Sequence, residues 1–141
     1  MSDEPIVIER LLNAPVEKVW RAITDNSEMK KWYFDIAEFK AEPGFEFEFI
    51  AVGKDGVTRF THLCKITVVI ENKKLTYSWR YKGYEGMSYV TFELFDEDGK
   101  TKVKLTHTGV ETFPQTDAFL RQNFVEGWTY IVGKSLKEFV E

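Results

Sequence analysis

The sequence is poor in cysteine and in long hydrophobic runs. Cys64 is the one cysteine among 141 residues, which excludes an internal disulfide and supplies no second thiol for zinc or redox chemistry. No stretch approaches the run of about 18 apolar residues that a membrane span requires, and residues 1–5 are acidic and polar, unlike a signal peptide. We therefore expect a cytoplasmic protein that does not span a membrane.

The sequence also has fewer basic residues than acidic ones. The chain has 19 lysines and arginines against 23 acidic residues, and its formal net charge is −4 with the two signs interspersed. Nucleic-acid binders usually carry a basic patch, so nucleic acid is not an expected partner. The chain also lacks a phosphate-binding glycine loop, a nucleophile elbow and the paired histidines of a metalloprotease. We predict no cofactor, no metal and no catalytic residue that the sequence alone can assign.

The chain shows neither internal repeats nor a flexible linker. Its length suits one ordinary domain with a sizeable core, so we predict a single domain over residues 1–141. Within it, four tryptophans, six tyrosines and twelve phenylalanines make up 16% of the residues. This aromatic content exceeds what a small core usually requires, and it favours a cavity with aromatic walls.

Alternating hydrophobic residues dominate the middle of the sequence. In residues 45–49, three phenylalanines alternate with two glutamates, which is the period of two expected for a half-buried strand. Further strand-like segments are residues 6–12, 60–68, 75–81, 90–94 and 103–107. We predict an antiparallel sheet of these segments, with one wet face and one aromatic face. In residues 60–68 the inner face holds the even-numbered side chains, from Phe60 to Val68.

Two short helices are predicted directly after the first strand. Val16, Val19 and Ile23 form an apolar stripe at helical spacing, and Pro15 suits the first turn of that helix. The polar residues that follow offer caps for a second short helix at residues 28–32.

The last segment, residues 117–140, has the pattern of a long amphipathic helix that lies across the sheet. Its apolar side comprises Leu120, Phe124, Trp128, Ile131, Leu136 and Phe139. Gly127 and Gly133 interrupt the helix, each at a cost of about 1 kcal/mol relative to alanine. Gly127 has two equally weighted explanations: a close approach to the sheet or to a ligand, or room for a neighbouring tryptophan.

Several short motifs, in a fixed order, resemble a known family. They are Ala14-Pro15, Glu17, Val19-Trp20, Ala22, Thr24, Trp32, Pro43-Gly44, Trp79, Leu105-Thr106-His107, Gly109 and Gly127-Trp128. The family is that of the activator-of-Hsp90-ATPase homologues. It is part of the START-like (SRPBCC) superfamily, which includes lipid-transfer proteins, birch-pollen allergens and aromatic polyketide cyclases.

The resemblance implies an α+β helix-grip (START-like) fold. In that fold a curved antiparallel sheet of six to seven strands wraps around a long C-terminal helix, and two short helices follow the first strand. A cavity lies between the sheet and the long helix. Phe45 and Cys64 stand where relatives often have glycine, and their bulk predicts a smaller or differently shaped cavity here.

From the inward faces and the resemblance together, we predict that the protein binds a hydrophobic or aromatic small molecule in this cavity. The predicted lining comprises Trp32, Phe47, Phe60, His62, Cys64, Tyr77, Trp79, Tyr81, Phe92, His107, Phe124, Trp128 and Ile131. In this hypothesis the walls supply affinity, and the histidines with one or two tyrosines fix the orientation of the ligand.

Three alternatives remain open at this point. His62, Cys64 and His107 all fall on the inner face and would form a metal site or a thiol–imidazole pair if their strands placed them together. A cyclase-like or hydrolase-like enzyme would use a cavity histidine or tyrosine to move a proton. A protein-interaction module would dock its sheet edge, or residues 32–34, on a chaperone or another protein. Eukaryotic chaperone activators place a separate amino-terminal domain before this one, so chaperone stimulation is the less favoured form.

Overall fold

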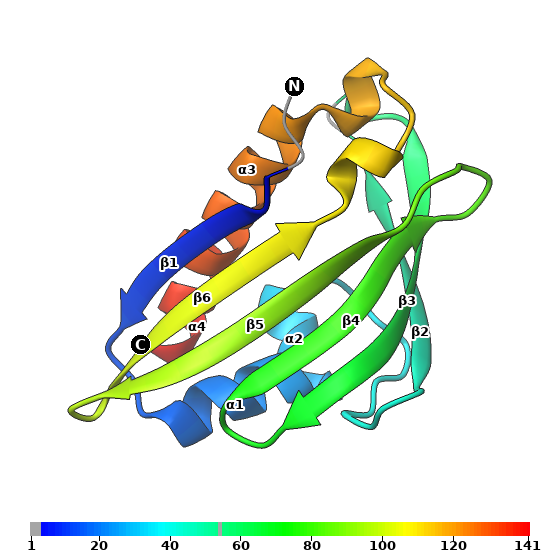
Figure 1. Cartoon of the computed structure of the whole chain (residues 1–141). Coiled ribbons are helices and arrows are strands. Elements are labelled where there is room, and N and C mark those ends of the chain that lie inside the picture. Colours follow the sequence, from blue (N-terminus) through cyan, green and yellow to red (C-terminus); the bar gives the residue numbers. More distant parts are fainter. Residues whose placement is uncertain (1–3, 54) are drawn as a thin grey trace.

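One curved antiparallel sheet carries the fold (Figure 1). The computed structural model describes residues 4–53 and 55–141. The strands are β1 (Ile6–Leu12), β2 (Glu46–Val52), β3 (Arg59–Ile70), β4 (Lys74–Tyr81), β5 (Ser88–Glu97) and β6 (Lys100–Thr108). Their order across the sheet is β1-β6-β5-β4-β3-β2, so the strands from β2 to β6 pair successively as hairpins and β6 also pairs with β1. The predicted α+β fold with a six-stranded antiparallel sheet is confirmed.

The predicted alternation of inner and outer side chains holds along most strands. On β2, Phe47 and Phe49 are buried while Glu46 and Glu48 are exposed. The exception is a bulge on β3, where the register of pairing with β4 shifts between Ile66 and Val68. A bulge adds one residue to one strand and so reverses the faces beyond it. Val69, opposite Leu75, therefore packs on the core, and the prediction that Val68 faces inward is wrong.

The helices α1 (Val16–Thr24) and α2 (Asn26–Trp32) lie at the lower end of the sheet in Figure 1. The apolar stripe of α1 buries Val19, Ala22 and Ile23. α2 begins two residues before the predicted start, because Asp25 caps it. One carboxylate oxygen of Asp25 accepts hydrogen bonds from the backbone N–H groups of Ser27 and Glu28, at 3.0 and 3.2 Å. These bonds satisfy amide groups that the first turn of a helix leaves without partners.

Replacing Asp25 with alanine is expected to lower the free energy of unfolding by about 1 kcal/mol, the typical value of such a cap. A hydrogen bond from the Ser27 hydroxyl, together with these backbone hydrogen bonds, holds the pKa of Asp25 below its usual value of 3.8. The contribution of its charged form is therefore complete above pH 3.8 and disappears as the pH falls through the lowered folded pKa. Urea unfolding of both proteins at pH 7 and pH 2.5 checks this. An equal difference in stability at both pH values would contradict it.

The predicted long C-terminal helix is confirmed over residues 121–140, but it starts later than predicted and contains a π-helical segment. It consists of α3 (Arg121–Tyr130), the π-helical segment η3 (Ile131–Leu136) and α4 (Lys137–Val140), and the short turns η1 (Val110–Thr112) and η2 (Asp117–Phe119) precede it. Leu120 has an extended backbone between η2 and α3, and half of its surface is exposed. The predictions that the helix starts at residue 117 and that Leu120 packs on the sheet are therefore wrong.

The π-helical segment also changes which side chains face the sheet. A π-helix has more residues in each turn than an α-helix, so it rotates the residues beyond it around the axis. Val132, Leu136 and Val140 are buried, whereas the predicted Ile131 and Phe139 are half-buried. The helix thus keeps an apolar face. The residues that form this face are not those that a constant period of about 3.6 residues predicts.

The core lies between the inner face of the sheet and the helices. Two connecting segments also contribute to it, with the side chains of Ile36, Phe39 and Phe113. Within the described residues, no helix is long and apolar enough to cross a membrane. Residues 1–3 of the polar start, and Lys54 of the hairpin between β2 and β3, lie outside the described residues.

Candidate functional site

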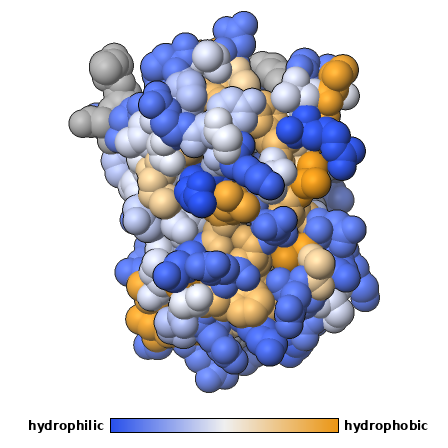
Figure 2. All heavy atoms as spheres, turned by 90° about the vertical axis from the view of Figure 1, so that its right-hand side faces the viewer, coloured by the Kyte–Doolittle hydropathy of each residue, from blue (hydrophilic) through white to orange (hydrophobic). Residues whose placement is uncertain are grey.

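A cleft of about 510 Å³ opens between α3 and the strands β2, β3 and β4. It is lined by Phe34, Ala51, Val52, Gly53, His62, Trp79, Tyr81, Ala118, Asn123, Phe124, Glu126, Gly127, Trp128, Tyr130 and Ile131. Figure 2 shows the side of the molecule that carries β2 and β3, where hydrophobic surface forms a band framed by hydrophilic residues. Most of the lining is aromatic or aliphatic, and the volume lies within the range of about 300–1,000 Å³ that is common for small-molecule sites.

The inner wall of the cleft is a cluster of rings around His62. The His62 ring stacks on Phe49, with 4.4 Å between ring centres and 15° between ring planes. Phe34 also stacks on Phe49, with 4.4 Å between ring centres. The rings of Trp79 and Tyr81 meet His62 edge to face at 4.9 and 4.7 Å. Edge-to-face and offset contacts are the favourable geometries for aromatic pairs. The wall is therefore a packed, pre-formed surface.

His62 is a neutral side chain in this wall. Burial lowers its pKa from 6.5 to about 4, because the low-dielectric surroundings disfavour the charged imidazolium. Nδ1 lies 3.1 Å from the carbonyl oxygen of Phe60. Since a carbonyl only accepts, Nδ1 carries the proton and donates it. At neutral pH the cleft therefore presents an uncharged imidazole.

His107, predicted to line the cavity, is instead the centre of a closed hydrogen-bond chain in the core. Trp128 Nε1 donates to Nδ1 of His107 at 2.9 Å, and Nε2 lies 2.8 Å from Ser88 Oγ. The Ser88 hydroxyl donates to the carbonyl oxygen of Trp79 at 2.8 Å. This chain fixes the neutral tautomer with the proton on Nε2, and burial lowers the pKa of His107 to about 3. Nδ1 thus connects the sheet to α3, and Nε2 connects β6 to β5.

The two buried histidines predict a specific pH dependence of stability. The unfolded chain binds a proton at each histidine below pH 6.5, whereas the folded protein stays neutral until about pH 4 at His62 and about pH 3 at His107. Stability is therefore complete above pH 6.5 and decreases as the pH falls, by about 1.4 kcal/mol per pH unit for each histidine. Replacing His62 with phenylalanine is expected to halve the slope between pH 6 and pH 5, measured by urea unfolding. An unchanged slope would mean that His62 is not held neutral.

Tyr81 contributes a polar atom to the same wall. Its hydroxyl oxygen accepts a hydrogen bond from Trp79 Nε1 at 2.9 Å. Burial raises the pKa of Tyr81 well above its usual value of 10, so the hydroxyl keeps its proton. Tyr77 is also buried, and its hydroxyl lies 2.6 Å from that of Tyr33; neither tyrosine lines the cleft.

The two helix glycines have different surroundings. A Cβ atom at Gly127 would meet no atom within 4 Å, and Gly127 lines the cleft. Gly127 is exposed, so neither contact with the sheet nor room for a tryptophan accounts for it. At Gly133 a Cβ atom would lie 3.0 Å from Nε of Arg10, which crosses from β1. Gly133 therefore makes room for that side chain.

The structure brings six of the thirteen predicted cavity residues to the cleft: His62, Trp79, Tyr81, Phe124, Trp128 and Ile131. Trp32, Tyr77, Phe92 and His107 are buried elsewhere in the core. Trp32, for example, donates from Nε1 to the carbonyl oxygen of Ala22 at 2.8 Å. Phe60 borders a smaller hollow of about 300 Å³ next to the cleft. The contacts between Trp79 and Trp128, 5.4 Å between ring centres, close the middle of the space between helix and sheet.

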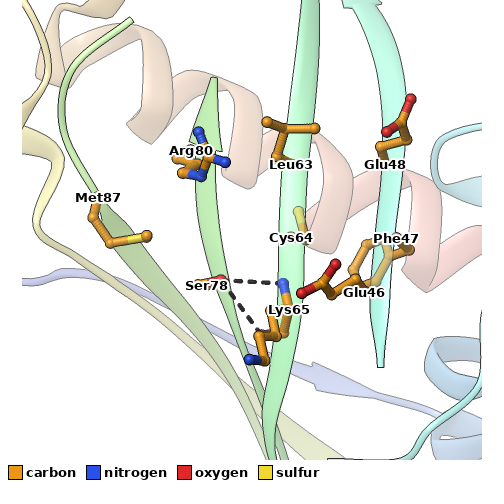
Figure 3. A pocket seen from close by; sticks show the side chains of 9 residues that line it. All are labelled: Glu46, Phe47, Glu48, Leu63, Cys64, Lys65, Ser78, Arg80 and Met87. Carbon is orange, nitrogen blue, oxygen red and sulfur yellow. Dashed lines mark hydrogen bonds between the residues drawn. The ribbon is translucent and has the colours of Figure 1, made fainter. Parts of the chain in front are cut away.

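Phe47 and Cys64 border a separate hollow of about 390 Å³ that opens on the outer face of the sheet (Figure 3). There β3 and β4 are not paired between Leu63 and Ile66, and the Ser78 hydroxyl contacts the backbone of Lys65 instead. Burial raises the pKa of the Cys64 thiol far above its usual value, so the thiol is protonated and unreactive at neutral pH. The other side chains around this hollow are mostly charged and exposed, which is typical of a solvated sheet face.

The remaining cleft residues were not predicted as lining. Phe34 comes from the connection after α2, Ala51 to Gly53 from the end of β2, and Ala118 from η2. The positions of these residues depend on how the loops fold back over the open end of the sheet. Hydrophobic periodicity in the sequence does not predict that loop conformation. Gly127 was the one member with a sequence signal, since glycine is unfavourable inside a helix.

His62, Cys64 and His107 do not form a metal site. Over residues 4–53 and 55–141, no three side chains of histidine, cysteine, aspartate or glutamate gather closely enough to hold a metal ion. The thiol–imidazole alternative also lacks support, because the buried thiol stays protonated and both nitrogens of His107 have other partners.

Comparison with protein families gives a match over most of the chain. The family described as Activator of Hsp90 ATPase homolog 1-like protein matches residues 13–141. The chain belongs to this family. The resemblance seen in the order of the motifs is therefore confirmed, and the family agrees with the START-like arrangement of sheet and long helix.

Solved structures repeat the fold along nearly the full chain. Protein CV1439 from Chromobacterium violaceum is similar, with a TM-score of 0.81 and 22% identity, covering 97% of this chain and 96% of that one. Mll3558 from Rhizobium loti has a TM-score of 0.82 at 17% identity, with 96% of each chain covered. BH1534 from Bacillus halodurans has a TM-score of 0.74 at 28% identity, covering 98% and 97%. A search of the curated proteins gives no match.

Proposed function

We propose that this protein binds an apolar or aromatic small molecule in the cleft between α3 and the strands β2 to β4. The observation that carries the proposal is the pre-formed aromatic wall of Trp79, Tyr81 and Trp128 facing a cleft of about 510 Å³. Gly127 supports it, because a helix-weakening residue stands where any side chain would project into open space. A fold that only needed packing would gain stability from alanine there.

The energetics of the cleft favour a ligand with a large apolar surface. Each Å² of apolar ligand surface that leaves water contributes about 25 cal/mol. The rings of the wall are already packed on one another, as the contact of Trp79 with Trp128 and that of His62 with Phe49 show. Binding therefore needs little ordering of the protein, and less of the gain is lost to conformational entropy.

Native mass spectrometry of the purified protein, followed by organic extraction, tests the proposal. We expect a second species heavier by the mass of one small molecule, and the extract identifies that molecule. The Gly127→Phe variant should be isolated without the added mass. Loss of the added mass after mild unfolding, together with its absence from the variant, would support the cleft as the site. The same added mass on both proteins would contradict it.

A second candidate function is protein binding through the edge of the sheet. Within the described residues, β2 is an edge strand that pairs with β3 alone, and its side chains Ile50 and Val52 are each about half exposed. β2 lies on the side of the molecule that faces the viewer in Figure 2. The family description names the ATPase of a chaperone, so the direct test is whether the protein changes Hsp90 ATP hydrolysis. If neither the wild-type protein nor an Ile50→Lys variant changes the rate of ATP hydrolysis by Hsp90, this candidate function is excluded.

The other docking segment considered from the sequence, residues 32–34, does not form an exposed patch. Trp32 is buried, and Tyr33 and Phe34 pack against the core. Catalysis by His107 also lacks support, because both ring nitrogens are engaged and the side chain does not border the cleft. Small-molecule binding is therefore the function that the site supports best.

A further inference from the structure

The hydrogen-bonding groups of the cleft restrict the ligand further than its apolar walls do. The hydroxyl of Tyr81 can accept a hydrogen bond at its oxygen and can donate one through its proton. The acceptor role is taken by Trp79 Nε1 at 2.9 Å. Among the described residues, no acceptor takes the hydroxyl proton of Tyr81. Because Tyr81 borders the cleft, an acceptor on a ligand bound there can take the place of water at this donor.

The charge of the lining points in the same direction. Among the described residues that border the cleft there is no lysine or arginine, and Glu126 is the one charged side chain. His62 is neutral at physiological pH, since burial lowers its pKa to about 4. An anionic ligand would lose its hydration in the cleft without meeting a lysine or arginine among the described lining residues, which is unfavourable.

We propose that the cleft selects an uncharged ligand that carries a hydrogen-bond acceptor, such as a carbonyl oxygen, beside its apolar or aromatic body. Tyr81 donates its hydroxyl proton to that acceptor, and Trp79 orients the hydroxyl by donating to its oxygen. Tyr81 is thus the residue that determines specificity in the cleft. This inference rests on the proposed small-molecule binding, and it adds the chemical class of the ligand.

The arrangement has a structural reason. Trp79 and Tyr81 lie two residues apart on β4, so their side chains project from the same face of the sheet. Phe113 and Phe119 pack edge to face or tilted on the Tyr81 ring at 5.0 and 4.9 Å, and they fix the ring from the side of the connecting turns. A hydroxyl that is held in this way loses little freedom on binding, which favours a strong preference for a matching acceptor.

Three probes with nearly the same body separate the possibilities: 1-tetralone has a carbonyl, tetralin has none, and 1-naphthoate is an anion. We expect the wild-type protein to bind 1-tetralone on the order of ten-fold more tightly than tetralin, as one hydrogen bond to an otherwise unpaired buried donor implies. 1-Naphthoate should bind more weakly than either. Dissociation constants are measured by NMR titration, in which the indole N–H signal of Trp79 reports directly on the Tyr81 hydroxyl.

The Tyr81→Phe variant should bind 1-tetralone and tetralin equally, with tetralin binding unchanged. Tyr77→Phe is the matched control, because it removes a buried hydroxyl that pairs with Tyr33 and does not border the cleft. Its preference for 1-tetralone should equal that of the wild type. Equal binding of the two neutral probes to the wild-type protein, or tighter binding of 1-naphthoate, would overturn this inference alone. Binding of none of the probes would contradict the proposed function itself.

Discussion

A phenylalanine in place of Gly127 is expected to weaken binding of an apolar ligand by about 100-fold while the protein stays folded. The new side chain would project into the open space of the cleft, where a Cβ atom meets nothing within 4 Å. It would displace ligand surface of roughly 100 Å², and at about 25 cal/mol for each Å² that loss corresponds to about 2.5 kcal/mol of affinity. Titration with 1-tetralone, observed by NMR, measures the effect.

Two control variants separate occlusion of the cleft from damage to the helix. Gly127→Ala adds one methyl group and is expected to raise the free energy of unfolding by about 1 kcal/mol, because alanine favours a helix over glycine. Thr129→Phe places the same ring on an exposed position of α3 that does not border the cleft, and it should leave affinity unchanged. If Gly127→Phe binds as tightly as wild type, the ligand site lies elsewhere.

Alanine in place of Trp128 is expected to lower the free energy of unfolding by about 3–5 kcal/mol, the largest stability effect that we predict. The indole is 97% buried, contacts the rings of Trp79 and Phe92, and donates to Nδ1 of His107. Its removal leaves a cavity at the point where α3 meets the sheet and an unpaired buried acceptor at His107. Urea unfolding monitored by circular dichroism gives the value.

Trp128→Phe divides this effect into its two parts. Phenylalanine keeps most of the ring contacts and loses the donor to His107, so we expect a loss of about 1–3 kcal/mol from the unpaired nitrogen. A double variant with His107→Leu should recover part of that loss, because the orphaned acceptor is then absent. A Trp128→Ala variant that loses less than about 1 kcal/mol would show that α3 is held by other contacts.

The strands could be predicted because their alternation is strong. Phe47 and Phe49 face inward and the glutamates beside them face water, and this pattern gives both the strand and its buried face. The motifs around Trp20, Trp79 and Trp128 then placed these strands in the correct family. The inward orientation of His62 followed from the same alternation.

The opening of the cleft could not be predicted from those patterns. It depends on Phe34, Gly53 and Ala118, which lie outside the strands and the long helix and whose positions follow from tertiary packing rather than from a period. Beyond the π-helical segment, Val140 is buried and the predicted Phe139 is half-buried. Predictions from helix and strand patterns assume ideal periods. They therefore do not predict the β3 bulge or the π segment.

The most direct test of small-molecule binding in the cleft is an NMR structure analysis of the protein with 1-tetralone, based on contacts between ligand and protein protons. We predict contacts with the rings of Trp79, Tyr81 and Trp128 and with the α protons of Gly127, and none with Trp20 or Trp32. Contacts with Met87 and Leu63 on the outer face of the sheet, or no contacts at saturating ligand, would contradict the account.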